Sequence, residues 1–411
     1  MKKNTKLAAL LATIGPGIFL VGYNIGTGSI TTMAATGAEY GMLLVWPLLL
    51  SCIFTFFLII AFGRFTAVTG DTALHSFRKY FGAPAALFVL AALLVSEFTS
   101  SIGVMAIVTQ IVQEWSRPLT PSGEGFNTII LTVIFVTLIY AVFWNGNYSF
   151  FEKILALFVG LMGFSFVLTM FMVSPDPAEI ITGLIPRIPE GSNAPLLIAG
   201  MAGTTMGGVL YVVRSILVKE KGWTVRDLHI EKRDALISVA IMFLLSVAIM
   251  VSAAGTLHPR GLLVENAIDM VRLLEPLAGR FAISVFVAGI VCAGLSSLFP
   301  IAILGPWLLA DYNDTPRDMR STQSRVFVLG VLSLGLIVPI FGGRPVLIMI
   351  VSQVLLTLAT PLIVLLMIIL LNRESIMGEH RPTRAMNVML IVIFAFSLLM
   401  AGIGVIGLMG L

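Results

Sequence analysis

Long apolar stretches alternate with short polar or charged segments along the whole chain. A helix needs roughly 18 or more mostly apolar residues to cross a bilayer. The pattern predicts eleven membrane-spanning helices, at 7–40, 42–68, 84–113, 127–145, 149–173, 195–218, 234–257, 279–310, 325–342, 345–371 and 386–410. Two further segments, 71–82 and 262–277, are amphipathic and too charged to span, and we expect them to lie along the membrane surface.

The first and sixth predicted spans are interrupted near their middles. The first contains a cluster of glycine and polar residues, namely Gly22, Asn24, Gly26, Thr27, Gly28 and Ser29. The sixth repeats the pattern with Thr204, Thr205, Met206, Gly207 and Gly208. Glycine costs a helix about 1 kcal/mol relative to alanine, and unwound backbone at membrane depth must line a cavity or pack in protein. Two matching breaks therefore indicate a mid-membrane binding site, with close packing through small residues as the alternative.

The two interrupted spans lie five spans apart. This spacing predicts an all-α polytopic membrane protein of the LeuT type, with a five-plus-five inverted repeat and an eleventh helix. The first repeat covers 7–173, the second 195–371 and the added helix 386–410, within a single transmembrane domain. With the N-terminus in the cytoplasm, 18 of the 25 lysines and arginines lie on the inner side. We therefore expect a multi-pass inner-membrane protein with its C-terminus outside.

Composition supports a membrane protein and narrows the partners. The chain is 58% hydrophobic and 11% charged, whereas soluble domains carry about 25% charged residues. The net charge of +4 comes from basic loop residues and indicates no nucleic-acid binding. Both cysteines lie in apolar spans, and the four histidines lie in loops or at span edges. We expect no enzymatic activity and no cofactor; the bilayer is the expected partner, one chain is sufficient, and the oligomeric state stays open.

Five stretches of the chain carry a family resemblance, namely GPGIFLVGYNIGTGSITTMAATGAEYGMLLVW, RFTAVTGDTALHSFRKYFG, EFTSSIGVMAI, GTTMGGVLYVVRS and SQVLLTLATPLIVLLMIILLNRESIMG. Together, and in this order, they resemble the Nramp family of divalent-metal transporters. The resemblance implies a secondary-active transporter that works by alternating access. The metal motifs differ, however. Where the family has Asp-Pro-Gly-Asn, this chain has residues 24–28, and where the family has Met-Pro-His, it has residues 206–208. The position of a further histidine of the family falls near Val213, where this chain has no histidine. The chain therefore resembles a divergent branch of the family.

The altered motifs change the expected substrate. Neither break contains Asp, Glu, His or Cys, so we expect no transition-metal site. Helix N-termini beside glycines and hydroxyls suit an anion, which favours a small anion such as bicarbonate. A divalent cation of the magnesium or manganese type, coupled to protons, is the alternative, and a non-transporting receptor or sensor is a further one. The expected substrate-binding residues are Asn24, Gly26, Thr27, Gly28, Ser29, Thr204, Thr205, Met206, Gly207, Gly208 and Gln353.

Candidate coupling residues lie outside the two breaks. Glu97 occupies the place of an aspartate in the family's proton pathway, with a buried structural pair as the alternative, and Ser100 replaces a nearby family glutamate. Ala293, Ser296 and Ser297 resemble the sodium site of LeuT-type symporters, which the carbonyls of Gly22 and Ile25 would complete; small-residue packing is the alternative.

Arg214 is the one basic residue that is assigned to neither side of the membrane, and it lies within the sixth predicted span. It is expected either to attract an anion to an inner vestibule or to extend its charged end to the membrane interface. If bicarbonate is the substrate, sodium is the favoured coupling ion, because a proton and bicarbonate together form carbonic acid, which yields freely permeant carbon dioxide.

Overall fold

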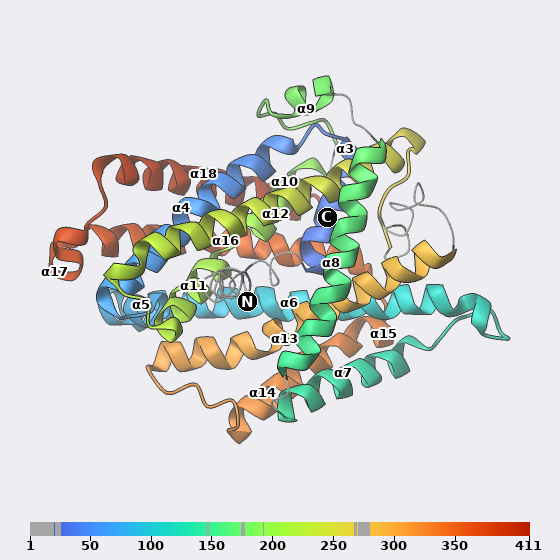
Figure 1. Cartoon of the computed structure of the whole chain (residues 1–411), viewed down its shortest axis with the longest axis horizontal. Helices are drawn as coiled ribbons and strands as arrows, with labels where there is room; N and C mark the ends of the chain where they lie inside the picture. The colour runs from blue at the N-terminus through green and yellow to red at the C-terminus, as the bar shows by residue number, and fades with distance from the viewer. Residues whose placement is uncertain are drawn as a thin grey trace, which may run out of the picture.

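The structure is a computed structural model that describes residues 20, 26–145, 148–173, 177–191, 193–266, 269 and 280–411. In this part of the chain, the regular elements are all helical (Figure 1). The α-helices are α3 (Thr27–Tyr40), α4 (Val45–Thr69), α5 (Ala73–Phe81), α6 (Ala83–Ser116), α7 (Thr128–Asn145), α8 (Tyr148–Val173), α9 (Pro177–Gly183), α10 (Ala194–Met206), α11 (Gly208–Lys221), α12 (Leu228–Thr256), α13 (Arg280–Asn313), α14 (Thr322–Ser333), α15 (Ile337–Phe341), α16 (Pro345–Asn372), α17 (Glu374–Met377) and α18 (Arg384–Met409).

The helices match the predicted membrane spans closely. Among the described residues, nine helical segments are long and apolar enough to cross a membrane. The fifth predicted span corresponds to α8, and the C-terminal part of the first corresponds to α3. The predicted surface segment 71–82 forms the helix α5. Most of 262–277 lies outside the described residues, and the described residues 262–266 form no helix. The expected all-helical, polytopic fold is therefore confirmed.

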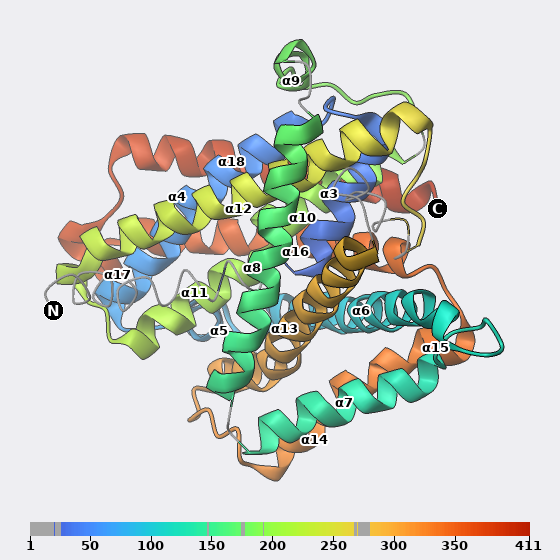
Figure 2. The same cartoon turned by 45° about the vertical axis from the view of Figure 1, so that its right-hand side comes forward.

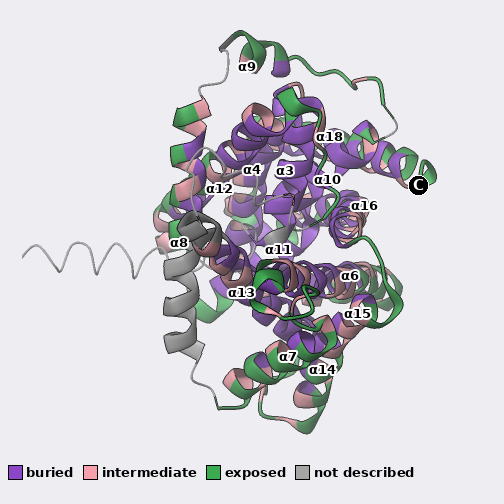
Figure 3. Cartoon of the chain, turned by 90° about the vertical axis from the view of Figure 1, so that its right-hand side faces the viewer, coloured by how far each residue is buried: buried purple, intermediate pink, exposed green. Residues whose placement is uncertain are grey.

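The interrupted pair α10 and α11 lies at the centre of the bundle (Figure 1). The most apolar 18-residue window in the segment Ala194–Lys221 is completely buried within the protein. Helices α3, α4 and α16 pack directly against α10, and α4 and α16 also contact α11. Buried positions accordingly concentrate on α3, α4, α10 and α16 (Figure 3). The centre of the protein is thus built around the sixth predicted span.

The outer helices present apolar side chains to the surroundings. Helices α7 and α14 lie side by side at one edge of the bundle (Figure 2). Only 22% of the most apolar 18-residue window of α7 is buried within the protein, and only 28% of that of the segment Thr322–Phe341, which begins with α14. Exposed residues on α7 include Ile130, Val133 and Ile134. An apolar surface of this kind is stable against lipid tails, so these helices are expected to contact the bilayer.

Close helix contact in the bundle depends on glycine at selected positions. Gly37 of α3 faces α12, where a β-carbon at residue 37 would lie 2.3 Å from the carbonyl oxygen of Met250. That oxygen belongs to the backbone, so the helices themselves would have to separate to accept a side chain. Gly402 of α18, by contrast, has open space around its missing β-carbon.

We predict that Gly37→Val lowers the free energy of unfolding by about 1–3 kcal/mol, the usual cost of overpacking a core. Thermal unfolding of the purified protein in detergent measures the effect. Gly402→Val is the matched control and should change the midpoint much less. Equal midpoints for the two variants would contradict the packing of α3 on α12.

Candidate functional site

The sixth predicted span is interrupted at Gly207. Helix α10 ends at Met206, helix α11 begins at Gly208, and Gly207 between them has φ −64° and ψ 136°. This extended backbone breaks the helical hydrogen-bond ladder within residues 196–218, all of which are buried in the protein. The predicted interruption is therefore present, and it frees backbone groups at the centre of the bundle.

Hydroxyl groups from neighbouring helices satisfy part of the freed backbone. Thr55 of α4 donates through Oγ1 to the carbonyl oxygen of Thr205 at 2.7 Å. Thr360 of α16 accepts a hydrogen bond through Oγ1 from the N–H of Gly208 at 3.0 Å. Such bonds matter because an unpaired polar group buried away from water is costly. The interruption is thus a built feature that two other helices support.

The first predicted span is described mainly on the C-terminal side of its interruption. Helix α3 begins at Thr27, and Gly26 before it is extended, with φ −82° and ψ −170°. The predicted site residues Gly22, Asn24 and Ile25 lie outside the described residues. Ser29 Oγ lies 2.6 Å from Thr204 Oγ1, which joins the start of α3 to the end of α10. The two interrupted spans therefore meet at their breaks.

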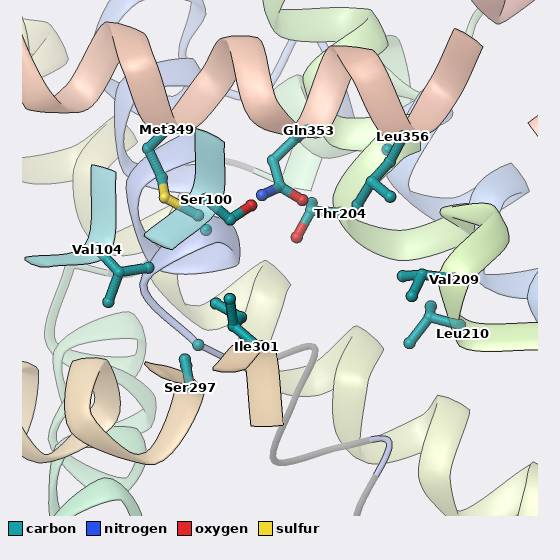
Figure 4. A pocket seen from close by; sticks show the side chains of 13 residues that line it. Ser100, Val104, Thr204, Val209, Leu210, Ser297, Ile301, Met349, Gln353 and Leu356 are labelled. Atoms are coloured by element: carbon teal, nitrogen blue, oxygen red, sulfur yellow. The ribbon is translucent and has the colours of Figure 1, made fainter. Parts of the chain in front are cut away.

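A small pocket lies where these segments meet (Figure 4). Its volume is about 30 Å³, enough for about two water molecules. Ser100, Thr204 and Gln353 carry their polar groups toward one another in this pocket, and Val209 and Leu210 form an apolar wall (Figure 4). Among the described residues, the lining consists of Gly26, Gly28, Ser100, Val104, Gly203, Thr204, Val209, Leu210, Ser297, Ile301, Met349, Gln353 and Leu356.

The lining residues that the structure describes include no ionisable side chain. Its polar side chains are three hydroxyls and the Gln353 amide, and its sulfur atom comes from Met349. Within the described ranges, no group of three or more His, Cys, Asp or Glu side chains is placed to hold a metal ion. Transition metals favour imidazole or thiolate ligands, and calcium or magnesium sites usually use carboxylates. The described lining therefore offers only neutral ligands to an ion.

Several predicted substrate residues line the pocket, and others do not. Gly26, Gly28, Thr204 and Gln353 are in the lining. The remaining described members of the set lie outside it but belong to the same interrupted segments, namely Thr27, Ser29, Thr205, Met206, Gly207 and Gly208. Thr205 Oγ1 donates to the Met201 carbonyl at 2.6 Å, so its hydroxyl serves its own helix. Their roles in binding stay predictions.

Most lining residues that sequence reasoning missed lie one helical turn from a residue that it named. Met349 and Leu356 lie four residues before and three after Gln353 on α16. Val104 follows Ser100 by four residues, and Ile301 follows Ser297 by four. Residues three or four apart share a helix face. Helical spacing is therefore the signal that could have found them.

Close packing explains some of the glycines in the two breaks. A β-carbon at Gly203 would lie 1.8 Å from the carbonyl oxygen of Gln353. A β-carbon at Gly28 would lie 2.8 Å from the Gln353 amide nitrogen. Both glycines let α16 approach the interrupted spans. The alternative of close helix packing thus holds for these positions alongside the helix break.

Arg214 differs from both sequence-based expectations. Its side chain is fully buried on α11, where Nη2 binds Glu231 Oε1 at 3.3 Å and Nη1 binds Asp234 Oδ2 on α12. Its guanidinium carbon lies 5.4 Å from the centre of the Trp223 ring. A side chain held by two carboxylates neither faces an open vestibule nor reaches toward the interface. Arg214 therefore joins α11 to α12, which the sequence did not predict because the partners lie 17 and 20 residues away.

The predicted coupling residues occupy two neighbouring helices. Ser296 and Ser297 of α13 both donate through Oγ to the Ala293 carbonyl at 2.9 Å, and Ser297 also lines the pocket. Glu97 is buried on α6, about one turn before Ser100. Since the proposed span-one sodium ligands lie outside the described residues, both coupling assignments stay predictions.

The fold and its buried, interrupted helix define the class as that of helical membrane transporters with a LeuT-like architecture. The model of the family described as "Natural resistance-associated macrophage protein-like" matches residues 17–407. The chain therefore belongs to the Nramp family, a family of membrane transporters.

Curated relatives match at low identity over most of this chain. A natural resistance-associated macrophage protein 2 homolog from Dictyostelium discoideum is 23% identical over 92% of this chain and 61% of its own length. This chain thus spans less than two thirds of that relative. The divalent metal cation transporter MntH of Klebsiella pneumoniae is 25% identical over 97% of this chain and 94% of its own length.

Solved structures confirm the architecture. A manganese transporter from Eremococcus coleocola, in complex with an aromatic bis-isothiourea substituted compound, has a TM-score of 0.74 at 14% identity and covers 98% of this chain and 87% of its own. MhsT in complex with L-phenylalanine has a TM-score of 0.62 at 16% identity over 97% and 98% of the two chains. At these identities the likeness shows the fold alone.

The buried ion pairs of Arg214 generate a stability prediction. We expect Arg214→Gln to lower the free energy of unfolding by about 3–5 kcal/mol, because it leaves two carboxylates buried without their cation. Thermal unfolding in detergent measures the loss, and the exposed Arg226→Gln is the matched control. Adding Glu231→Gln to the Arg214 variant should recover part of the loss. A midpoint for Arg214→Gln equal to that of the control would contradict this account.

Proposed function

We propose that this protein is a secondary-active transporter that moves a small inorganic ion by alternating access around the pocket at Gly207. The observation that carries the proposal is the break between α10 and α11, which opens directly onto that pocket. Interrupted helices at the centre of a LeuT-like bundle supply substrate sites in transporters of this kind. Family membership supports the same reading.

The first substrate candidate is a divalent metal cation. Support comes from the relatives, since the Klebsiella protein is named a divalent metal cation transporter and the Eremococcus protein a manganese transporter. The uncharged lining disfavours a fully dehydrated divalent ion, because such an ion needs compensating negative charge. A hard ion that keeps part of its water shell, such as magnesium, suits such a lining better. The pocket would have to widen to admit that shell.

A small anion such as bicarbonate is the second candidate, and one specific observation favours it. Helices α3 and α11 both begin at the pocket, which is lined by Gly26 and Gly28 from the first and by Val209 and Leu210 from the second. Helix N-termini carry partial positive charge and favour anions. The pairing of Arg214 with two carboxylates removes the additional positive charge that the sequence had suggested. The anion candidate therefore has less support than the cation candidate.

The coupling ion follows from the substrate. Entry of an anion into a cell with a negative interior is opposed by about 2.3 kcal/mol per charge per 100 mV, so anion uptake needs a co-transported cation. Sodium bound at Ala293, Ser296 and Ser297 would be the coupling ion for an anionic substrate. A proton carried by Glu97 would be the coupling ion for a divalent cation.

We further propose that the N-terminus is cytoplasmic, from the distribution of basic residues.

Uptake by purified protein in proteoliposomes tests the proposed function. Labelled manganese, a magnesium indicator and labelled bicarbonate are compared, each with and without an imposed gradient of protons or sodium. We expect saturable uptake of magnesium above that of manganese. Saturable uptake of bicarbonate instead would favour the second candidate, and uptake of none of the three would favour a receptor on the same fold.

A single added carboxylate separates the two substrate candidates. Ser100 is buried and lines the pocket, and Ser100→Asp places negative charge beside the substrate. We predict that it lowers the KM for the divalent cation about tenfold, which corresponds to about 1.4 kcal/mol. Ser100→Asn is the matched neutral control of similar size. Loss of uptake in the aspartate variant, with uptake kept in the asparagine variant, would reject the cation and favour an anion.

The sodium assignment has its own test. If sodium binds at α13, replacing both Ser296 and Ser297 by alanine should abolish any dependence of uptake on a sodium gradient, because two hydroxyl ligands are lost. Flux measured at fixed membrane potential with and without sodium gives the readout, and Glu97→Gln is the comparison. Sodium-independent uptake that Glu97→Gln abolishes would assign the coupling to protons.

A further inference from the structure

A second cavity, of about 330 Å³, lies where α13 ends and α14 begins. The loop between these helices folds around it, and the cavity shares no lining residue with the pocket at Gly207. The loop carries Asp314, Arg317, Asp318 and Arg320 between two apolar spans, which places it at a membrane surface. The cavity therefore lies at the level of lipid headgroups.

The polarity of the cavity changes with depth. Its rim at the helix ends includes the exposed residues Asn313 and Gln323. Its base, farther along the two spans, includes buried Pro306 and half-buried Leu309 and Phe327. On α14 nearby, Val326 is 65% exposed and Leu329 is also exposed. A polar rim above an apolar base follows the polarity of a phospholipid from headgroup to acyl chain.

The rim also carries one charge of each sign. Arg317 lines the cavity and binds Glu220 at the end of α11, with its guanidinium carbon 5.9 Å from the centre of the Trp307 ring. Asp318 lines it as well and accepts through Oδ1 from the Arg320 N–H at 2.8 Å. The Asp318 carbonyl also accepts from Ser324 Oγ at 2.8 Å, which holds the loop in place.

We propose that this cavity binds the headgroup of a phosphatidylethanolamine-type lipid. The lipid phosphate would pair with Arg317, and the primary ammonium would donate to the Asp318 carboxylate. An anionic headgroup without an ammonium would bring its negative charge near Asp318 with no compensation. A choline headgroup has no N–H to donate. The acyl chains would leave over the apolar base toward the exposed face of α14.

Native mass spectrometry of the purified full chain tests this proposal. Phosphatidylethanolamine, phosphatidylcholine and phosphatidylglycerol with identical acyl chains are titrated in turn. We expect the ethanolamine lipid to bind about two- to fivefold more tightly than either of the others, the range of a partly exposed charge pair. Equal retention of the three lipids would overturn the proposal.

Two pairs of variants assign the contacts. Asp318→Asn should abolish the preference for ethanolamine over choline. Asp314→Asn, in the same loop but outside the lining, should keep it; asparagine also tolerates the positive φ of 52° at residue 314. Arg317→Gln should weaken all three lipids, whereas Glu220→Gln, which breaks the same ion pair, should not. A preference that survives Asp318→Asn would overturn the assignment.

A final arm separates a lipid from a soluble ligand. Glycerophosphoethanolamine carries the same headgroup without acyl chains, so it should fail to displace the bound lipid at equal concentration. If it competes as well as the intact lipid, the cavity binds a soluble phosphate ester and the lipid proposal is wrong. None of these outcomes depends on which ion the protein transports.

Discussion

The structure depends on one constraint, which is that the backbone freed at Gly207 must find hydrogen-bond partners inside a membrane bundle. Water cannot serve these groups in hydrocarbon, so protein side chains must. Thr55 and Thr360 supply bonds on either side of the break. These contacts require α4 and α16 to lie close to α10 and α11, and the glycines at 28 and 203 allow α16 to do so. The close packing of α4 and α16 and the pocket beside them therefore both result from the break at Gly207.

The same constraint shapes the chemistry of the pocket. Helices that meet through glycine and small hydroxyl residues leave little volume, and the pocket holds only about 30 Å³. Its described lining is uncharged, although the family comparisons lead to proteins named as metal transporters. A neutral lining cannot offset the charge of a bare divalent ion. The substrate must therefore bring its own water or draw its stabilisation from helix termini and backbone carbonyls.

Much of the fold was predictable from hydropathy, because bilayer thickness sets the length of each span. The predicted break in the sixth span is found at Gly207, and it was predictable because glycine is a poor helix former within an apolar span. The environment of Arg214 was not predictable, because its carboxylate partners come from the next helix. Met349 and Leu356 were missed for a different reason. An apolar residue that lines a cavity has the same sequence pattern as a core residue, and only its helical spacing from a polar lining residue such as Gln353 indicates the cavity.

In the proposed transport cycle, the pocket beside Gly207 opens in turn to both sides of the membrane. Labelling of a single introduced cysteine tests this opening, in a variant in which Cys52 and Cys292 are first replaced by alanine. Val209→Cys lies in the pocket, and Val354→Cys is buried on α16 outside the lining. We expect a membrane-impermeant maleimide to label residue 209 from either side, the transported ion to slow this labelling, and residue 354 to stay unlabelled. Equal resistance of both positions from both sides would contradict it.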